Sequence, residues 1–334
     1  MKRCILVSLL SLAFALLLPL AVPRFLPRPL VPVPEAVPPT DEPGAEVLRR
    51  RADEGVTVTF LRGGQVREIS LADYLPGVLA GEMPASFEEE ALRAQAVAAR
   101  TFALFHALRG GAAHPGAAVC DDPACCQVWL DEEALRERWG EDAPEYLRRI
   151  RSAVADTDGE YLTYEGQPIL ACFHSSSAGQ TENSAAVWGT ALPYLVSVDS
   201  PETAEDVPNY ISTVEIAPED FRETILAEYP GCAIRETLPP DWLGARTLDT
   251  GGRVASVRVG GTSISGTKMR SLFSLRSACF TLEWTGHSFL FTVTGYGHGA
   301  GMSQYGANVM AREGSTWREI LAHYYPGTEL TMLA

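Results

Sequence analysis

Clustered positive charge is what this 334-residue sequence lacks most clearly. Its 27 lysines and arginines are outnumbered by 42 aspartates and glutamates, which gives a formal net charge of −15 at pH 7. Binding to DNA or RNA needs Lys and Arg gathered against the phosphates, and peripheral docking on anionic lipid needs the same. We therefore expect no nucleic-acid partner, and a ligand that meets local positive groups.

The sequence also lacks internal repeats and a dense, even cysteine framework. Three cysteines are clustered and the others are scattered, which differs from a disulfide-stapled mini-protein. A composition of 46% hydrophobic and 21% charged residues is ordinary for a globular protein, and the length suits one large domain or two modest ones.

The N-terminal segment is the longest apolar run. Lys2 and Arg3 precede an apolar stretch over residues 4–22, about long enough to cross a bilayer as a helix. We favour an uncleaved anchor at residues 1–22, and the alternative is a signal peptide cut near residues 19–21. Either interpretation places the rest of the chain outside the cytoplasm, and the first makes it a single-pass protein of the cell membrane.

Proline then marks a boundary. Residues 23–55 form a Pro-rich linker that we expect to be a stiff spacer. The folded domain is expected over residues 56–330, with a variable middle region at about 205–288.

Strand and helix patterns come in blocks, which favours an α+β fold of mixed, largely antiparallel sheets with packed helices forming a substrate groove. The predicted strands are 56–61, 160–164, 168–173 and 289–294, and the predicted helices are 71–79, 86–108 (with Ser86 and Glu89 as a capping box), 132–154, 218–228 and 316–324.

Glu82 is the first candidate for chemistry. Pro84 disfavours helix at Met83, so Glu82 is expected at a chain reversal beside apolar residues. A carboxyl group that loses hydration has a raised pKa, which suits a general acid near neutral pH. The alternative is an ordinary surface glutamate before a helix.

Two loops are candidates for ligand binding. Residues 173–183 place a run of hydroxyls after a strand, which suits hydrogen bonding to sugar, although a polar turn that satisfies its own backbone is the alternative. Residues 295–306 contain five glycines, and their spacing does not fit a dinucleotide-binding motif. A loop that positions His298, Ser303, Gln304 and Tyr305 at a cleft fits better than that motif, and the alternative is a structural Gly-rich turn.

A metal site is also indicated. His114, Cys120, Cys125 and Cys126 match a Cys3His zinc site, whose closed ligand set would make the metal structural. A disulfide, such as Cys120 with Cys125, is the alternative.

Taken together, three segments resemble the SpoIID (stage II sporulation protein D) family. The opening motif corresponds to residues 74–84 and 91–101, the middle motif to residues 173–177, 181–183, 187–189, 193–195 and 198–200, and the closing motif to residues 297–307 and 323–328. The similarity spans about residues 56–330, and an N-terminal membrane anchor also fits the family.

The resemblance implies a lytic transglycosylase acting on peptidoglycan strands already stripped of stem peptides. It also implies a partner amidase and a membrane scaffold protein during engulfment in sporulating bacteria. The family's catalytic acid corresponds to Glu82, and its motif arginine to Arg100, which would pair with the lactyl carboxylate of the substrate or orient Glu82. Some members bind zinc through a Cys/His loop where this chain has residues 114–126. Others lack this loop, which implies that the metal is not needed for the chemistry. The other residues expected to bind substrate are His174, Ser175, Ser176, Ser177, Thr181, Glu182, His298, Ser303, Gln304 and Tyr305.

Other functions compete with this one. The main rival is a glycan-binding protein that activates a cell-wall amidase without cutting. A cysteine or serine hydrolase using Cys172 and His174 is disfavoured, because no nucleophile elbow surrounds a serine. A catalytic zinc hydrolase is disfavoured because the four candidate ligands form a closed set.

Overall fold

A computed structural model describes residues 52–109, 114, 116–122, 125–235 and 237–334. The predicted membrane anchor and nearly all of the predicted linker lie outside these ranges. Within the described ranges, no helix combines the length and the apolar character needed to cross a bilayer. The expectations for the N-terminal segment therefore stay predictions.

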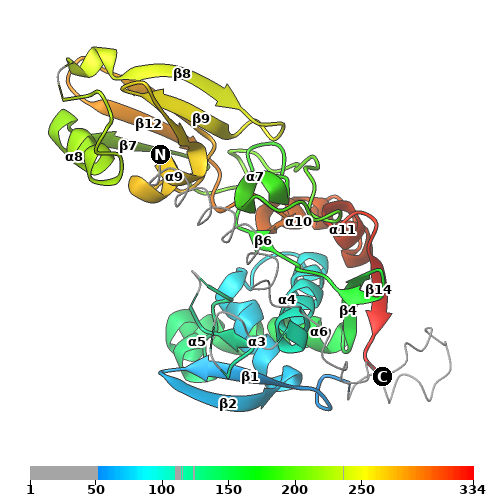
Figure 1. Cartoon of the computed structure of the whole chain (residues 1–334). Helices are drawn as coiled ribbons and strands as arrows, with labels where there is room; N and C mark the ends of the chain where they lie inside the picture. The colour runs from blue at the N-terminus through cyan, green and yellow to red at the C-terminus, as the bar shows by residue number, and fades with distance from the viewer. Residues whose placement is uncertain (1–51, 110–113, 115, 123–124, 236) are drawn as a thin grey trace, which may run out of the picture. The chain divides into compact units, whose positions relative to one another are not determined.

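Helices and strands follow one another in blocks (Figure 1). The described chain up to residue 200 contains β1 (Thr57–Arg62), β2 (Gln65–Ser70), α3 (Leu71–Glu82), α4 (Glu89–Arg109), β3 (Val119–Cys120), α5 (Glu132–Trp139), α6 (Ala143–Asp156), β4 (Glu160–Tyr164), β5 (Gln167–Pro168), β6 (Phe173–His174) and α7 (Ser184–Trp188). The remainder contains β7 (Ile211–Ile216), α8 (Pro218–Glu228), β8 (Leu243–Leu248), β9 (Val254–Val259), β10 (Thr262–Ser265), α9 (Gly266–Leu272), β11 (Phe280–Trp284), β12 (Phe289–Thr294), β13 (Met302–Ser303), α10 (Gln304–Arg312), α11 (Trp317–Tyr324) and β14 (Glu329–Met332).

The sheets are small. Their strand orders are β2-β1-β3, β10-β9-β8, β11-β12-β7, β14-β4-β5 and β13-β6. Among the described strands, β1 with β3 and β6 with β13 pair in parallel, and the other pairs are antiparallel. This confirms the predicted α+β fold with mixed, largely antiparallel sheets.

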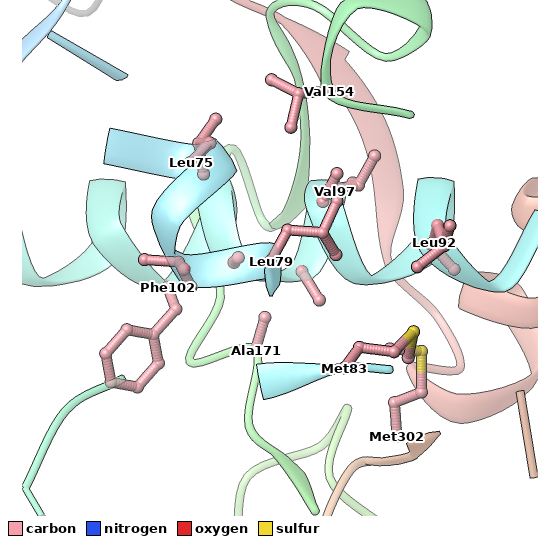
Figure 2. Packing of buried hydrophobic residues seen from close by; sticks show 14 of the residues in the cluster. Leu75, Leu79, Met83, Leu92, Val97, Phe102, Val154, Ala171 and Met302 are labelled. Carbon is pink, nitrogen blue, oxygen red and sulfur yellow. The ribbon is translucent and has the colours of Figure 1, made fainter. Parts of the chain in front are cut away.

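The Ala-rich helix α4 is the centre of the larger core. Its alanines leave room for close approach of neighbouring elements, and α3, α6, α10 and α11 all contact it. Figure 2 shows Leu79 of α3, Val97 of α4 and Val154 of α6 in this cluster, all nearly inaccessible to solvent. Because burying such a side chain contributes about 1.5–3 kcal/mol, the packing fixes α3 and therefore its last residue, Glu82.

A second core lies under the sheets β10-β9-β8 and β11-β12-β7. Stacked and tilted aromatic rings dominate it, with Phe221 of α8 only 4.1 Å from Phe289 of β12 between ring centroids. The alternating burial of β12 supplies Phe289, Phe291 and Val293 to this core. The cluster thus covers most of the predicted middle region and also includes β12, beyond its predicted end.

Several element predictions are confirmed closely and others need correction. Helix α8 and strand β12 have the predicted bounds. Helix α4 begins at Glu89, not at Ser86, because Phe87 N–H closes a turn onto Pro84 and Glu88 N–H donates to Asn308 Oδ1 at 2.8 Å.

The predicted helix over residues 132–154 is divided into α5 and α6. Gly140, with a φ of 54°, ends α5, and a proline begins α6 within its first two positions. The strands predicted over residues 160–164 and 168–173 do form a hairpin, which turns through Glu165 and Gly166, both at positive φ, but its second strand is limited to β5. Strand β6 pairs instead with β13.

Candidate active site

Glu82 is the last residue of α3. Met83 follows in an extended conformation, with φ −123° and ψ 139°, as the proline at position 84 favours. The helix is therefore longer than predicted, and Glu82 is held on a helix end that packs on α4. A side chain on a buried helix is positioned more rigidly than one on a free turn.

The chain segment that follows the cysteine cluster lies directly against α3. Leu130 N–H donates to Gly77 O at 3.2 Å, and Trp129 Nε1 donates to Tyr74 O at 3.1 Å. A Cβ atom at Gly77 would lie 2.5 Å from Trp129 Nε1, and one at Gly81 would lie 2.9 Å from the carbonyl oxygen of Val128. These two glycines thus open one face of α3 to the passing backbone.

That segment provides the hydrogen bond of Glu82. Val128 N–H donates to Glu82 Oε1 at 2.6 Å, and within the described part of the chain Glu82 makes no ion pair. Burial raises the pKa of Glu82 to about 7, and the Val128 N–H opposes this rise because it favours the charged carboxylate. The half-buried carboxyl group therefore holds its proton near neutral pH, as the sequence predicted.

The predicted zinc ligands come together. The ligand atoms of His114, Cys120, Cys125 and Cys126 all lie within 4.8 Å of one another. His114 Nε2 lies 3.1 Å from the sulfur of Cys125 and 3.4 Å from that of Cys126. Bond lengths of about 2.0–2.3 Å around tetrahedral Zn²⁺ put ligand atoms about 3.5–3.8 Å apart, so this donor set fits the ion. Cys120 and Cys125 are free thiols here, not the disulfide considered as the alternative.

The opening and closing motifs meet beside Glu82. Met83 shares a core cluster with Met302 of β13, and their side chains point toward each other in Figure 2. The ring of Phe87 lies 4.9 Å from that of Tyr305, edge to face. Strand β6, where the middle motif begins, pairs with β13 of the closing motif, so the middle motif also lies next to this contact.

Several of the predicted ligand-binding residues are buried in hydrogen-bond networks. Glu202, which is 2% exposed and was not predicted, accepts from Ser177 N–H at 2.6 Å and from the hydroxyls of Ser303 and Ser200. His174 Nε2 lies 2.7 Å from Ser177 Oγ, and burial holds the pKa of His174 well below its usual range. These contacts fix the loops that carry the half-exposed residues. The buried members of the predicted set around these loops are His174, Ser176, Ser177, Thr181, Glu182, Ser303 and Gln304.

The residues with partial exposure are fewer. Ser175, His298 and Tyr305 are half-buried, and their side chains are accessible enough to meet a ligand. Burial, together with Arg270 and Arg253, lowers the pKa of His298 to about 4, so its imidazole is neutral. The exposed ring of Trp188 lies 5.1 Å from that of His298 and extends this polar surface with an aromatic face.

Glu182 is deeply buried next to charged groups that the sequence did not indicate. Burial, and then a hydrogen bond with the Asp249 side chain, raise the pKa of Glu182 to about 7, while Arg253 opposes the rise. Asp249 and Arg253 come from the β8–β9 connection, more than 60 residues away in the sequence. No local pattern links them to Glu182.

Arg100 requires a correction. Its guanidinium is fully buried and forms a bidentate ion pair with Asp53, at 2.7 Å from Nε and 2.6 Å from Nη2. It also donates to the backbone carbonyl of Glu160. We predicted that Arg100 would meet the substrate or orient Glu82, but here it joins α4 to the start of the domain and to β4.

The comparisons with known proteins identify the family. The sequence model of the SpoIID family (stage II sporulation protein) matches residues 62–164. The chain is 38% identical over 290 residues to stage II sporulation protein D of Bacillus amyloliquefaciens, covering 86% of this chain and 82% of that protein. The same identity and coverage hold for stage II sporulation protein D of Bacillus subtilis (strain 168).

A more distant relative is the amidase enhancer of Bacillus subtilis (strain 168). It is 28% identical over 315 residues, covering 77% of this chain and 40% of that protein. The identity and coverage of the stage II sporulation proteins place this chain in the SpoIID family.

Proposed function

We propose that this protein is a lytic transglycosylase that cleaves the MurNAc–GlcNAc linkage of denuded peptidoglycan strands and leaves 1,6-anhydro-MurNAc ends. The observation that carries the proposal is Glu82, a carboxyl group protonated near neutral pH and held by one backbone N–H at the end of a packed helix. Its place beside the β6–β13 pair, which joins the middle and closing motifs, supports a role in a shared ligand site.

A single acid is sufficient for this reaction. Hydrolytic glycosidases generally use a pair of carboxyl groups, one of which activates water or attacks the sugar. Glu82 would instead donate its proton to the glycosidic oxygen as the C1–O bond breaks. Its carboxylate would then accept the proton of the C6 hydroxyl as O6 bonds to C1, which closes the anhydro ring and regenerates the acid.

The loops would position the glycan. Ser175, His298 and Tyr305 are the predicted residues with accessible side chains, and we assign them to ligand contact. The buried residues of the same loops would position these three side chains, because the hydrogen bonds of Glu202 and His174 hold the loop in place.

We further propose that His114, Cys120, Cys125 and Cys126 bind a structural Zn²⁺. Its chemistry is that of a crosslink, since the four protein ligands leave no open position for a substrate or water. The loop it would fix leads within two residues to Val128, whose N–H holds Glu82. The metal would therefore steady the acid without taking part in the reaction.

The cellular location that we propose rests on the family and on the N-terminal sequence. We propose a membrane protein anchored by residues 1–22, with its domain outside the cytoplasm and, in a sporulating cell, between the two membranes around the forespore. A cell-wall amidase and a membrane scaffold protein are the proposed partners, the first supported by the similarity to an amidase enhancer.

That similarity also supports a second candidate function, a glycan-binding activator of an amidase that does not cut. Mass analysis of products from denuded glycan separates the two. New anhydro ends from the parent protein and none from a folded Glu82→Gln variant are expected for the enzyme. Glycan binding without anhydro ends from the parent protein would favour the activator.

A further inference from the structure

A small cavity next to His298 is not explained by the proposed reaction. Its volume is about 120 Å³, and it is lined by α7, by the start of β9 and by the residues around Glu182. A cavity of about 150 Å³ in another protein holds benzene, with six heavy atoms. This one therefore has room for a chemical group of about four to five heavy atoms.

Arg253 lines the cavity with unused hydrogen-bond donors. It is 2% exposed, and within the described residues its Nε and Nη2 have no hydrogen-bond partner and it forms no ion pair. Its Nη1 reaches only the carbonyl of Gly297, at 3.5 Å. A buried guanidinium without acceptors is strongly destabilising, so these N–H groups call for a ligand acceptor.

The Gly-rich loop makes room for this guanidinium. Gly299 has a φ of 89°, and a Cβ atom there would lie 2.3 Å from Arg253 Cζ. Gly251 makes room for the carboxyl group of Glu182 in the same way, because a Cβ atom there would lie 2.8 Å from Glu182 Oε2. Both charged groups thus occupy spaces that only glycine leaves open.

Two carboxyl groups balance the arginine. Glu182 Oε1 accepts from Asn183 N–H at 2.7 Å, and Oε2 has no donor among the described residues. Asp249 is within hydrogen-bonding reach of Glu182, so the pair can share one proton. With one proton shared, the pair and Arg253 are together neutral, which disfavours a fully charged ligand of either sign.

Apart from His298, the remaining walls are small side chains, five of them apolar and two, Ser265 and Thr267, with a hydroxyl group. Ala186 and Val187 come from α7, and Val254, Ala255 and Ala278 come from the β9 side. These five side chains present methyl groups and no polar atoms. The ligand group that meets such a cavity has an acceptor for the arginine, a donor for the carboxyl pair and an alkyl end.

We infer that this cavity is a subsite for the acetamido group of an N-acetylated sugar. Arg253 donates to the amide carbonyl, the Glu182 and Asp249 carboxyl pair accepts from the amide N–H, and the alkyl walls enclose the methyl group. The exposed ring of Trp188, 5.1 Å from His298, provides a face for the sugar ring outside the cavity. The inference rests on the proposed function only in taking the ligand to be a glycan of N-acetylated sugars.

Binding to uncharged oligosaccharides tests the cavity. The full chain with Glu82→Gln, which prevents cleavage, is titrated calorimetrically with the N-acetylglucosamine tetramer and with the same tetramer carrying N-propionyl groups. One extra methylene at the apolar end of a small cavity is expected to weaken binding roughly 10- to 200-fold. Equal affinity for the two tetramers would overturn the subsite.

Two neighbouring alanines provide a matched pair of variants. Ala185 and Ala186 are both exposed on α7, and of the two Ala186 alone lines the cavity, so substitution at either should leave the fold intact. Ala186→Phe fills the cavity and is expected to weaken binding of the N-acetyl tetramer at least roughly tenfold, while Ala185→Phe leaves it within about twofold. Parent-like binding by Ala186→Phe would also overturn the subsite.

Different results would reject the subsite and the proposed reaction. Selective binding of N-acetyl groups without anhydro ends from the parent protein would reject the reaction and support the subsite. Anhydro ends formed equally well from N-acetyl and N-propionyl glycan would support the reaction and reject the subsite.

Discussion

Glu82, which is half-buried, and Glu182, which is buried, are two glutamates whose pKa values are both raised to about 7, but their surroundings differ. Glu82 ends a helix, accepts one backbone N–H and has no ion pair among the described residues. Glu182 lies beside Asp249 and Arg253, in a space left by Gly251.

The difference teaches that a raised pKa alone does not identify the catalytic acid. A solitary carboxyl group can give up its proton and recover it without rearranging a charge partner. A carboxyl group that shares a proton with a neighbour and balances an arginine is suited to hold a polar ligand. We therefore assign proton transfer to Glu82 and ligand binding to Glu182.

The largest difference expected between the two glutamates is in the turnover number of their variants. Glu82→Gln should lower kcat for anhydro-product formation by about 10²–10⁴-fold or more, because general acid catalysis contributes about that much. Glu182→Gln should leave kcat within a few fold and raise KM, because its interaction is present in both the ground state and the transition state. Steady-state kinetics on denuded glycan measure both, and the reverse pattern would exchange the two roles.

The pH dependence should follow Glu82. Because its carboxyl group must carry a proton to act, kcat should fall about tenfold per pH unit above roughly pH 7. The same decline should persist in Glu182→Gln, although both groups have similar pKa values. A decline that disappears in Glu182→Gln would mean that the wrong glutamate was assigned.

Metal removal should have a smaller effect on catalysis than either change above. Cys120→Ser should lose bound zinc, measured by elemental analysis, and should lower the melting temperature by roughly several degrees. Cleavage should be reduced but still detectable, because the closed ligand set takes no part in the reaction. Purified parent protein without metal would remove the zinc proposal, and complete loss of cleavage in a folded variant would contradict a structural role.

The smallest expected effect is on stability. The folded-state pKa of Glu82 is above its unfolded value of about 4.3, so its contribution is fully present below about pH 4 and is lost as pH rises from there through about 7. Glu82→Gln carries no charge to bury, and should be more stable than the parent at pH 8 by on the order of 1–3 kcal/mol, with little difference at pH 4. Urea unfolding at both pH values tests this, and an equal difference at pH 4 and pH 8 would contradict it.

Elements with strong local patterns could be predicted from the sequence. The alternating apolar residues of β12 and the proline at the start of α8 defined both elements with their observed bounds. The start of α4 could not be predicted, because Glu88 is capped by Asn308, 220 residues further along the chain.

In the candidate site, too, some residues could be predicted from local sequence and others could not. Glu82 and the four cysteine and histidine ligands are marked by local sequence, and the structure places them as separate but neighbouring groups. Arg253 and Asp249 carry no local signal, because only the fold brings the β8–β9 connection to Glu182. The structural role of Arg100 could not be predicted, because its partner Asp53 lies before the predicted start of the domain.

The most direct measurement is the titration of the Glu82 carboxyl group itself. Carbon-detected NMR of protein labelled with ¹³C at the glutamate carboxyl carbon, with Glu82→Gln to assign the signal, gives its pKa. The account predicts a midpoint near 7, caused by burial without a charge partner. A midpoint near the ordinary glutamate value of about 4.3 would contradict it, because such a group would have lost its proton before it could act as the acid.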